Sequence, residues 1–182
     1  MNELSLYILD IVQNSIAAGA TRVAIGLRVE GETLILTVED DGRGMAAELL
    51  ARVKSPFATT RTTRPVGLGI PMLEQCAAAT GGALGIDSAP GAGTRLWARF
   101  GLRHVDRPPL GDLPGTMVAL VLGSPDGPDF TLTLNDAIAL STAEVRAALG
   151  EVPLTTPDVL EWIRQAISEA LDGMNTDLSG IR

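Results

Sequence analysis

The chain has 182 residues, 46% of them hydrophobic, with a formal net charge of −8. This length suits one domain, or one domain with an extension, and the apolar content excludes a wholly disordered chain. The single cysteine, Cys76, excludes an intrachain disulfide and suits a reducing cytosol. Because no apolar run approaches the ~20 residues that span a bilayer and no signal peptide is recognisable, we expect a cytoplasmic protein without membrane contact.

The negative charge lies in one half of the sequence. Residues 1–104 carry ten basic and ten acidic side chains, whereas residues 105–182 carry four basic and twelve acidic ones. An acidic half disfavours nucleic acid as a partner, because phosphate contacts need clustered Lys and Arg. It suits docking on a basic protein surface, although a solvated acidic face is the more common explanation. We expect a protein partner at this C-terminal region.

The first predicted element is a helix over residues 3–18 that ends at Gly19. Asp10 and Asn14 lie four residues apart, which places them on the same helix face. The remaining faces are mostly apolar, with Leu6, Leu9, Ile11, Val12 and Ile16, so we expect a largely buried helix. Two interpretations of the polar pair stay open: hydrogen bonds to nearby backbone, or contacts to a hydrated metal ion and its phosphates.

Two strands over residues 22–30 and 33–39 are predicted next, joined at Gly31 as a hairpin. The second strand ends at Asp40-Asp-Gly42-Arg-Gly44-Met45. Glycine here allows positive φ and close approach to the backbone, and a carboxylate before such a turn can accept a hydrogen bond from an exocyclic amine such as that of adenine. Taken alone, Asp-Gly also makes ordinary turns. A short helix over 46–54 is expected to follow.

Residues 55–66 predict a loop that is polar, β-branched and bounded by prolines. Lys54, Arg61 and Arg64 give it cations that can reach phosphate oxygens, although a plain surface loop has the same composition. Gly67-Leu68-Gly69 follows and opens a helix over 71–80. Because a helix N-terminus preceded by glycines presents free amides to an anion, the pair of features favours a lid over phosphates.

The predicted module closes with strands over 83–88 and 94–102 around a glycine-rich turn at 90–93. A linker over 107–115 follows by composition. Beyond it, alternation and turn residues predict strands over 116–123 and 129–135, and helices over 141–149 and 155–171. These C-terminal strands can extend the first sheet or form a unit of their own.

Four ordered motifs together resemble the Bergerat-fold ATPases of the GHKL superfamily. Asn14-Ser-Ile-Ala-Ala-Gly-Ala-Thr-Arg-Val is similar to MutL-type ATPases. Ser55-Pro-Phe-Ala-Thr-Thr-Arg61 with Gly67-Leu-Gly69-Ile is similar to the lid and glycine box of sensor histidine kinases, and Gly91-Ala-Gly93-Thr94 to their last nucleotide motif. The resemblance implies an α/β two-layer sandwich over 1–104, a mixed sheet covered by helices on one face. Residues 105–182 would be a small α+β extension, with the option of continuing that sheet.

The resemblance also implies a Mg-ATP site. Asp10 would be the general base, where hydrolysing relatives usually have Glu, and Asn14 would be the magnesium ligand. Thr94 would support Asp40 in binding adenine through a water. The implied nucleotide-binding residues are Asn14, Asp40, Gly42, Gly44, Met45, Lys54, Phe57, Thr60, Arg61, Gly67, Leu68, Gly69 and Thr94. Asp10 is one methylene shorter than Glu, and Ala17 replaces an Asp of MutL-like proteins, so binding is expected to survive better than hydrolysis.

Three functions are compatible with these residues. The first is a slow ATPase or protein phosphotransferase in signalling. The second is a non-catalytic, ATP-gated protein-interaction module, and the third is a fold retained only as a scaffold. The whole chain also resembles small stand-alone histidine-kinase-like proteins of anaerobic bacteria associated with hydrogenase and other redox complexes. This resemblance implies a regulatory partner of that kind, and a homodimer stays open.

Overall fold

The structure is a computed structural model that describes residues 3–53 and 69–174, with six helices and six strands in these ranges. In chain order the elements are α1 (Leu4–Ala17), β1 (Arg22–Glu30), β2 (Thr33–Asp40), α2 (Ala47–Val53), α3 (Gly69–Ala79), β3 (Ala83–Ser88), β4 (Thr94–Gly101), α4 (Leu113–Gly123), β5 (Asp129–Leu134), β6 (Ala137–Ser141), α5 (Thr142–Leu149) and α6 (Pro157–Met174).

All six strands form one sheet in the order β3-β4-β2-β1-β5-β6. Neighbouring strands are antiparallel except β1 and β5, which run parallel with Val23 opposite Phe130. The predicted mixed sheet is therefore confirmed. The two C-terminal strands join the sheet formed by the first four, directly at the edge of β1.

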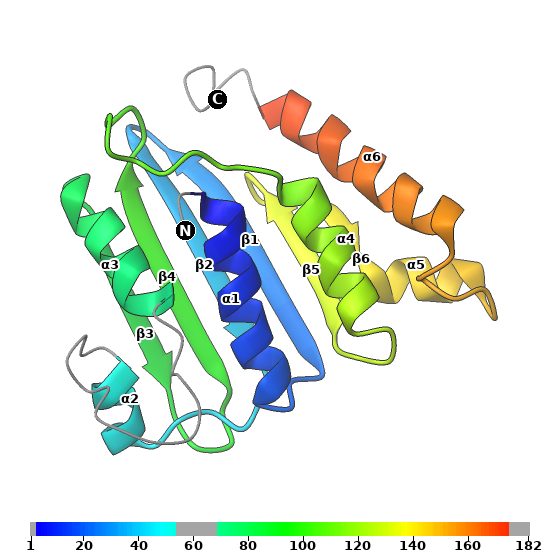
Figure 1. Cartoon of the computed structure of the whole chain (residues 1–182), viewed down its shortest axis with the longest axis horizontal. Coiled ribbons are helices and arrows are strands. Elements are labelled where there is room, and N and C mark those ends of the chain that lie inside the picture. Colours follow the sequence, from blue (N-terminus) through cyan, green and yellow to red (C-terminus); the bar gives the residue numbers. More distant parts are fainter. Residues whose placement is uncertain (1–2, 54–68, 175–182) are drawn as a thin grey trace.

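One face of the sheet is apolar and carries the helices. Along β1, Val23, Ile25 and Leu27 are at most 2% exposed, whereas the alternate residues Ala24 and Arg28 are exposed. Alternation of this kind is expected of a sheet with one face packed and the other solvated. Helices α3, α1, α4 and α6 follow one another across the packed face, as Figure 1 shows. The prediction of helices on one face is confirmed.

Helix α1 lies at the centre of the helical layer between α3 and α4. Leu4, Tyr7 and Ile8 are fully buried, whereas Leu6, expected on a buried face, is 40% exposed. Its first turn is tied to the C-terminal half, because the backbone amide of Leu4 donates to the Pro109 carbonyl at 2.9 Å. The free amides that begin a helix are thus partly satisfied from a segment a hundred residues away.

The main correction to the sequence-based elements is α4. Residues 116–123 were predicted as a strand, but they lie inside an α-helix that begins at Leu113. The Asp112 carboxylate caps this helix by accepting from the Gly115 amide at 2.8 Å. Because α4 is buried between α1 and α6, its apolar run has no polar face, and such a run cannot be told from a buried strand by periodicity.

A second correction concerns β6, a five-residue strand that the sequence did not indicate. Ser141, expected to open a helix, does so: its hydroxyl accepts from the Glu144 amide at 3.3 Å. Helix α6 runs three residues past its expected end at Leu171. In the described part of the chain, no helix is long and apolar enough to cross a membrane.

Candidate nucleotide-binding site

The carboxylate of Asp40 is fixed at the end of β2 by two donors. The Ser15 hydroxyl of α1 donates to Asp40 Oδ2 at 2.7 Å, and the Gly42 amide donates to Oδ1 at 2.9 Å. Ser15 itself is only 3% exposed. Each carboxylate oxygen can accept more than one hydrogen bond, so Asp40 is held in place while keeping capacity for a ligand donor.

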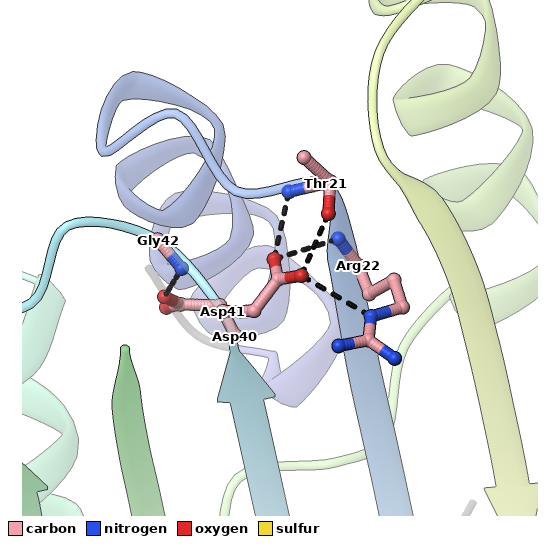
Figure 2. A network of polar contacts seen from close by, with 5 residues as sticks. All are labelled: Thr21, Arg22, Asp40, Asp41 and Gly42. Carbon is pink, nitrogen blue, oxygen red and sulfur yellow. Dashed lines mark hydrogen bonds and ion pairs between the residues drawn. The ribbon is translucent and has the colours of Figure 1, made fainter. Parts of the chain in front are cut away.

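The next residue, Asp41, faces the opposite way and ties the start of β1 to the end of β2 (Figure 2). Its carboxylate accepts from the Thr21 hydroxyl at 2.6 Å and amide at 2.7 Å, and from the Arg22 amide at 2.8 Å and Nε at 3.1 Å. These hydrogen bonds hold the pKa of Asp41 well below its usual range, and the one from the Thr21 hydroxyl has the largest effect. The two neighbouring acids therefore have different roles in the structure: Asp41 braces the corner from which Asp40 projects.

A cavity of about 320 Å³ opens between α1 and the ends of β2 and β4. Five of the predicted nucleotide-binding residues line it: Asn14, Asp40, Gly44, Met45 and Thr94. Its walls are otherwise mostly apolar, with Ile11, Val38, Leu49, Val53, Ile70, Ile86 and Leu96. An apolar pocket with a few convergent polar groups is typical of small-ligand sites, and its size and lining suit a planar base.

The turn before β4 approaches the Asp40 backbone closely. Gly93 has φ +75°, and a Cβ built on it would overlap the Asp40 carbonyl oxygen. Ser88, at the end of β3, joins the two sides of the cavity: it accepts from the Met45 amide at 2.9 Å and donates to the Gly93 carbonyl at 2.9 Å. Its oxygen is also 3.0 Å from Thr94 Oγ1. Glycine is thus needed at 93 for both backbone conformation and space.

Asp10 lies apart from the cavity lining, against the first residue of α3. A Cβ on Gly69 would overlap the Asp10 carboxylate, which places the two groups in direct proximity. Asp10 Oδ2 is buried and has no hydrogen-bond partner among the described residues. Burial raises the pKa of this carboxyl group. The structure therefore places an unpaired acid beside the N-terminus of the helix that was predicted to bind phosphate.

The described residues hold part of the predicted site. Lys54, Phe57, Thr60, Arg61, Gly67 and Leu68 lie outside them. Asn14 is exposed at the cavity, and no cluster of three or more His, Cys, Asp or Glu that could hold a metal occurs among the described residues. The amide oxygen of Asn14 is the kind of oxygen ligand that Mg2+ accepts.

Sequence reasoning missed Ser15, Ser88 and Arg43. Arg43 lines the cavity, and the two serines hold Asp40 and Met45. Ser15 carried a usable signal, since it is a hydroxyl directly after Asn14 in a largely apolar helix. Ser88 could have been singled out only from the pairing of β3 with β4, which brings it opposite Thr94.

An acid held by two donors at the end of β2, an asparagine of α1 and a glycine turn before β4 thus lie at or beside one cavity. Residues 2–104 match the family model described as Histidine kinase-, DNA gyrase B-, and HSP90-like ATPase. Because this match covers more than half of the chain, the protein belongs to that family. The GHKL resemblance of the sequence is confirmed.

Curated relatives are similar to part of the chain. The non-motile and phage-resistance protein of Caulobacter vibrioides is 31% identical over 111 residues, which cover 55% of this chain and 13% of that protein. The sensor histidine kinase CpxA of Escherichia coli is 28% identical over 100 residues, 52% of this chain and 22% of CpxA. The DNA mismatch repair protein MutL of Dictyoglomus thermophilum is 46% identical over 52 residues, 29% of this chain and 9% of MutL. The matched region spans less than a quarter of each of these relatives.

Proposed function

We propose that this protein binds Mg-ATP in the cavity beside Asp40 and acts as a slow ATPase or protein phosphotransferase in signalling. The observation that carries the proposal is the Asp40 carboxylate, held by Ser15 and the Gly42 amide at an apolar cavity of about 320 Å³. A fixed acceptor facing an apolar slot suits the exocyclic amine of adenine, because base and acceptor meet without rearrangement.

The phosphates would lie toward α3. Its N-terminal amides and dipole favour anions, and Gly69 begins the helix without a side chain. The amides of Gly67, Leu68 and Gly69, with Lys54, Phe57, Thr60 and Arg61, are proposed to surround the triphosphate. Asn14, exposed at the cavity, offers one amide oxygen. Magnesium keeps several waters and needs few protein ligands, so one such oxygen with phosphate oxygens is sufficient.

Asp10 is proposed as the general base. Its buried Oδ2 lacks a partner among the described residues, which leaves it able to accept a proton from an attacking water or acceptor hydroxyl. Burial raises its pKa, so the carboxylate is a stronger base than an exposed one. Bound magnesium would supply charge neutralisation at the transferring phosphoryl group.

A second function is an ATP-gated interaction module without turnover, acting as a regulatory partner of a redox or hydrogenase-type complex. Asp10 does not line the cavity in the described residues, and it is one methylene shorter than the Glu of hydrolysing relatives. Both observations favour binding over hydrolysis, because small errors in position are costly in rate.

The test is calorimetric titration of the purified protein with ATP and magnesium chloride, followed by a phosphate-release assay. We expect saturable binding that Asp40→Asn abolishes and that Asp87→Asn leaves unchanged. Asp87 is a matched control, because it is an exposed acid in β3 outside the cavity lining. Absence of binding at millimolar ATP would overturn the proposal. Turnover that disappears in Asp10→Asn supports the enzyme, and tight binding with no turnover supports the gated module.

A further inference from the structure

The edge of the sheet farthest from β3 is formed by β6, which pairs only with β5 among the described strands. A strand at an edge presents unpaired backbone amides and carbonyls that can pair with another chain. Natural edge strands usually carry charges or proline that prevent such pairing. In β6 the sequence is Ala-Ile-Ala-Leu-Ser, and it has neither.

A groove of about 560 Å³ runs along this edge between β6, α5 and α6. Its lining is largely apolar, with Ile138, Ala139 and Leu140 from β6, Val145, Ala148 and Leu149 from α5, and Val159 and Trp162 from α6. Two of these side chains face solvent to an unusual degree: Ile138 is 61% exposed and Trp162 is 54% exposed. Exposed apolar patches of this kind mark interaction sites, and tryptophan is enriched among residues that dominate binding energy.

The charges of the groove have one sign. Glu144 and Asp158 belong to the lining, and no Lys or Arg does. Neither carboxylate pairs with a basic side chain in the described ranges, and the nearby arginines are engaged elsewhere: Arg146 with Asp129 at 3.2 Å and Arg164 with Asp112 at 3.8 Å. A largely apolar groove whose lining includes two acids is complementary to a segment that is both apolar and basic.

We propose that this groove binds an extended peptide segment of another protein, which presents both apolar residues and Lys or Arg to the groove, as an added strand on β6. Successive side chains of a strand point to opposite sides, so every second residue of the segment enters the groove. There the apolar ones meet the apolar lining and a basic one meets Glu144 or Asp158. Strand addition of this kind obtains affinity from main-chain hydrogen bonds and specificity from the pockets. A second copy of the chain fits less well, since a two-fold axis through β6 would juxtapose these acids with their own copies.

This site is independent of the nucleotide site. The cavity beside Asp40 involves β2 and β4, and two strands, β1 and β5, lie between β2 and β6 in the sheet. The experiment is therefore done without nucleotide, so that failure to bind ATP and failure to bind peptide are separate results.

The probe is a phage library of random nine-residue peptides selected on the immobilised full chain. Enriched peptides are then synthesised with fluorescein and titrated by fluorescence anisotropy. We expect enriched sequences to combine apolar residues with Lys or Arg at every second position, and their affinity to fall at least about tenfold in Ile138→Glu. Glu144→Lys should weaken binding severalfold. Leu122→Glu should leave it unchanged, because Leu122 is 50% exposed on α4 and lies outside the groove lining.

The fold of each variant is checked by circular dichroism. The peptide-binding site is located in the wild type by changes in the amide chemical shifts of residues 137–141. Shifts confined to β6 and the groove support strand addition. The proposal is overturned if no peptide is enriched, if enriched peptides are acidic, or if they bind Ile138→Glu as well as the wild type. A doubled molar mass in solution that Ile138→Glu reduces to the monomer would assign the groove to a second copy and overturn it as well.

Discussion

Replacing Asp10 by Asn is expected to stabilise the nucleotide-free protein while removing its proposed base. The carboxylate lies against Gly69 with Oδ2 buried and without a partner among the described residues. A buried charge without compensation disfavours the folded state. An amide of nearly the same shape keeps the packing and removes the charge, so the change isolates the electrostatic cost.

The size of the effect follows from the burial. A buried polar group left without a partner costs about 1–3 kcal/mol, and more when it is charged. The Asn variant keeps the uncharged part of this cost, and Asp10 as a whole is only partly buried, so the gain lies at the lower end. A gain of about 1 kcal/mol raises the melting temperature by about 2–4 °C in a chain of this size. Because burial raises the folded-state pKa, the penalty is absent below the ordinary carboxyl pKa. It grows as pH rises from there to the folded-state value and is constant above it.

The assay is thermal unfolding of wild type and Asp10→Asn between pH 4 and pH 8 without nucleotide, with about half a pH unit between points. Asp126→Asn is the matched control, because Asp126 is exposed and its substitution removes the same charge from the surface. We expect the melting temperature of Asp10→Asn to exceed that of both other proteins at neutral pH, with the gap closing toward pH 4. An Asp10→Asn protein that melts at or below the control throughout this range would refute the reasoning.

Three further predictions concern the supports of the site. Ser15→Ala removes a donor to the Asp40 carboxylate and should weaken ATP binding about tenfold, measured by calorimetry, since hydrogen bonds to charged groups contribute about 1.5–3 kcal/mol. Gly93→Ala should lower the free energy of unfolding in urea by about 1–3 kcal/mol, because φ is +75° and its Cβ would meet the Asp40 carbonyl. Asp41→Asn should lower the melting temperature by a few degrees at pH 7. Because the folded pKa of Asp41 is depressed, this difference should disappear as pH falls below the ordinary carboxyl range, and a difference that persists at low pH would contradict the Thr21 contacts as its cause.

The site residues that belong to local sequence motifs were predictable. Asp40, Gly44 and Thr94 follow from the strand ends and glycine turns, and the structure brings them to one cavity. The supports were not predictable to the same degree, because Ser15 reaches Asp40 from 25 residues earlier. A contact of this kind depends on how α1 crosses the sheet, which no local pattern encodes.

In the fold too, elements with a clear local pattern were predicted, and elements that depend on their neighbours were not. The hairpin of β1 and β2 shows the period of two that a half-buried sheet requires, and it was predicted almost to the residue. Helix α4 was assigned wrongly because its sequence is apolar almost throughout, including Leu122, which is 50% exposed. It therefore has no polar stripe that would show a period of 3.6. The short strand β6 forms because β5 is present to pair with it, and its five residues carry little signal of their own.

The end of the family match at residue 104 is not the end of the sheet. Beyond it, β5 adds to the edge of β1 over six paired positions, and α4 packs against α1. The carbonyls of Pro109 and Leu110 also accept the first two amides of α1, at 2.9 Å each. Since α1 carries Asp10, Asn14 and Ser15, the C-terminal residues support the helix on which the proposed nucleotide chemistry depends. We therefore expect a fragment of residues 1–104 to lose both stability and any affinity for ATP, because it would expose the β1 edge and the apolar side of α1 together.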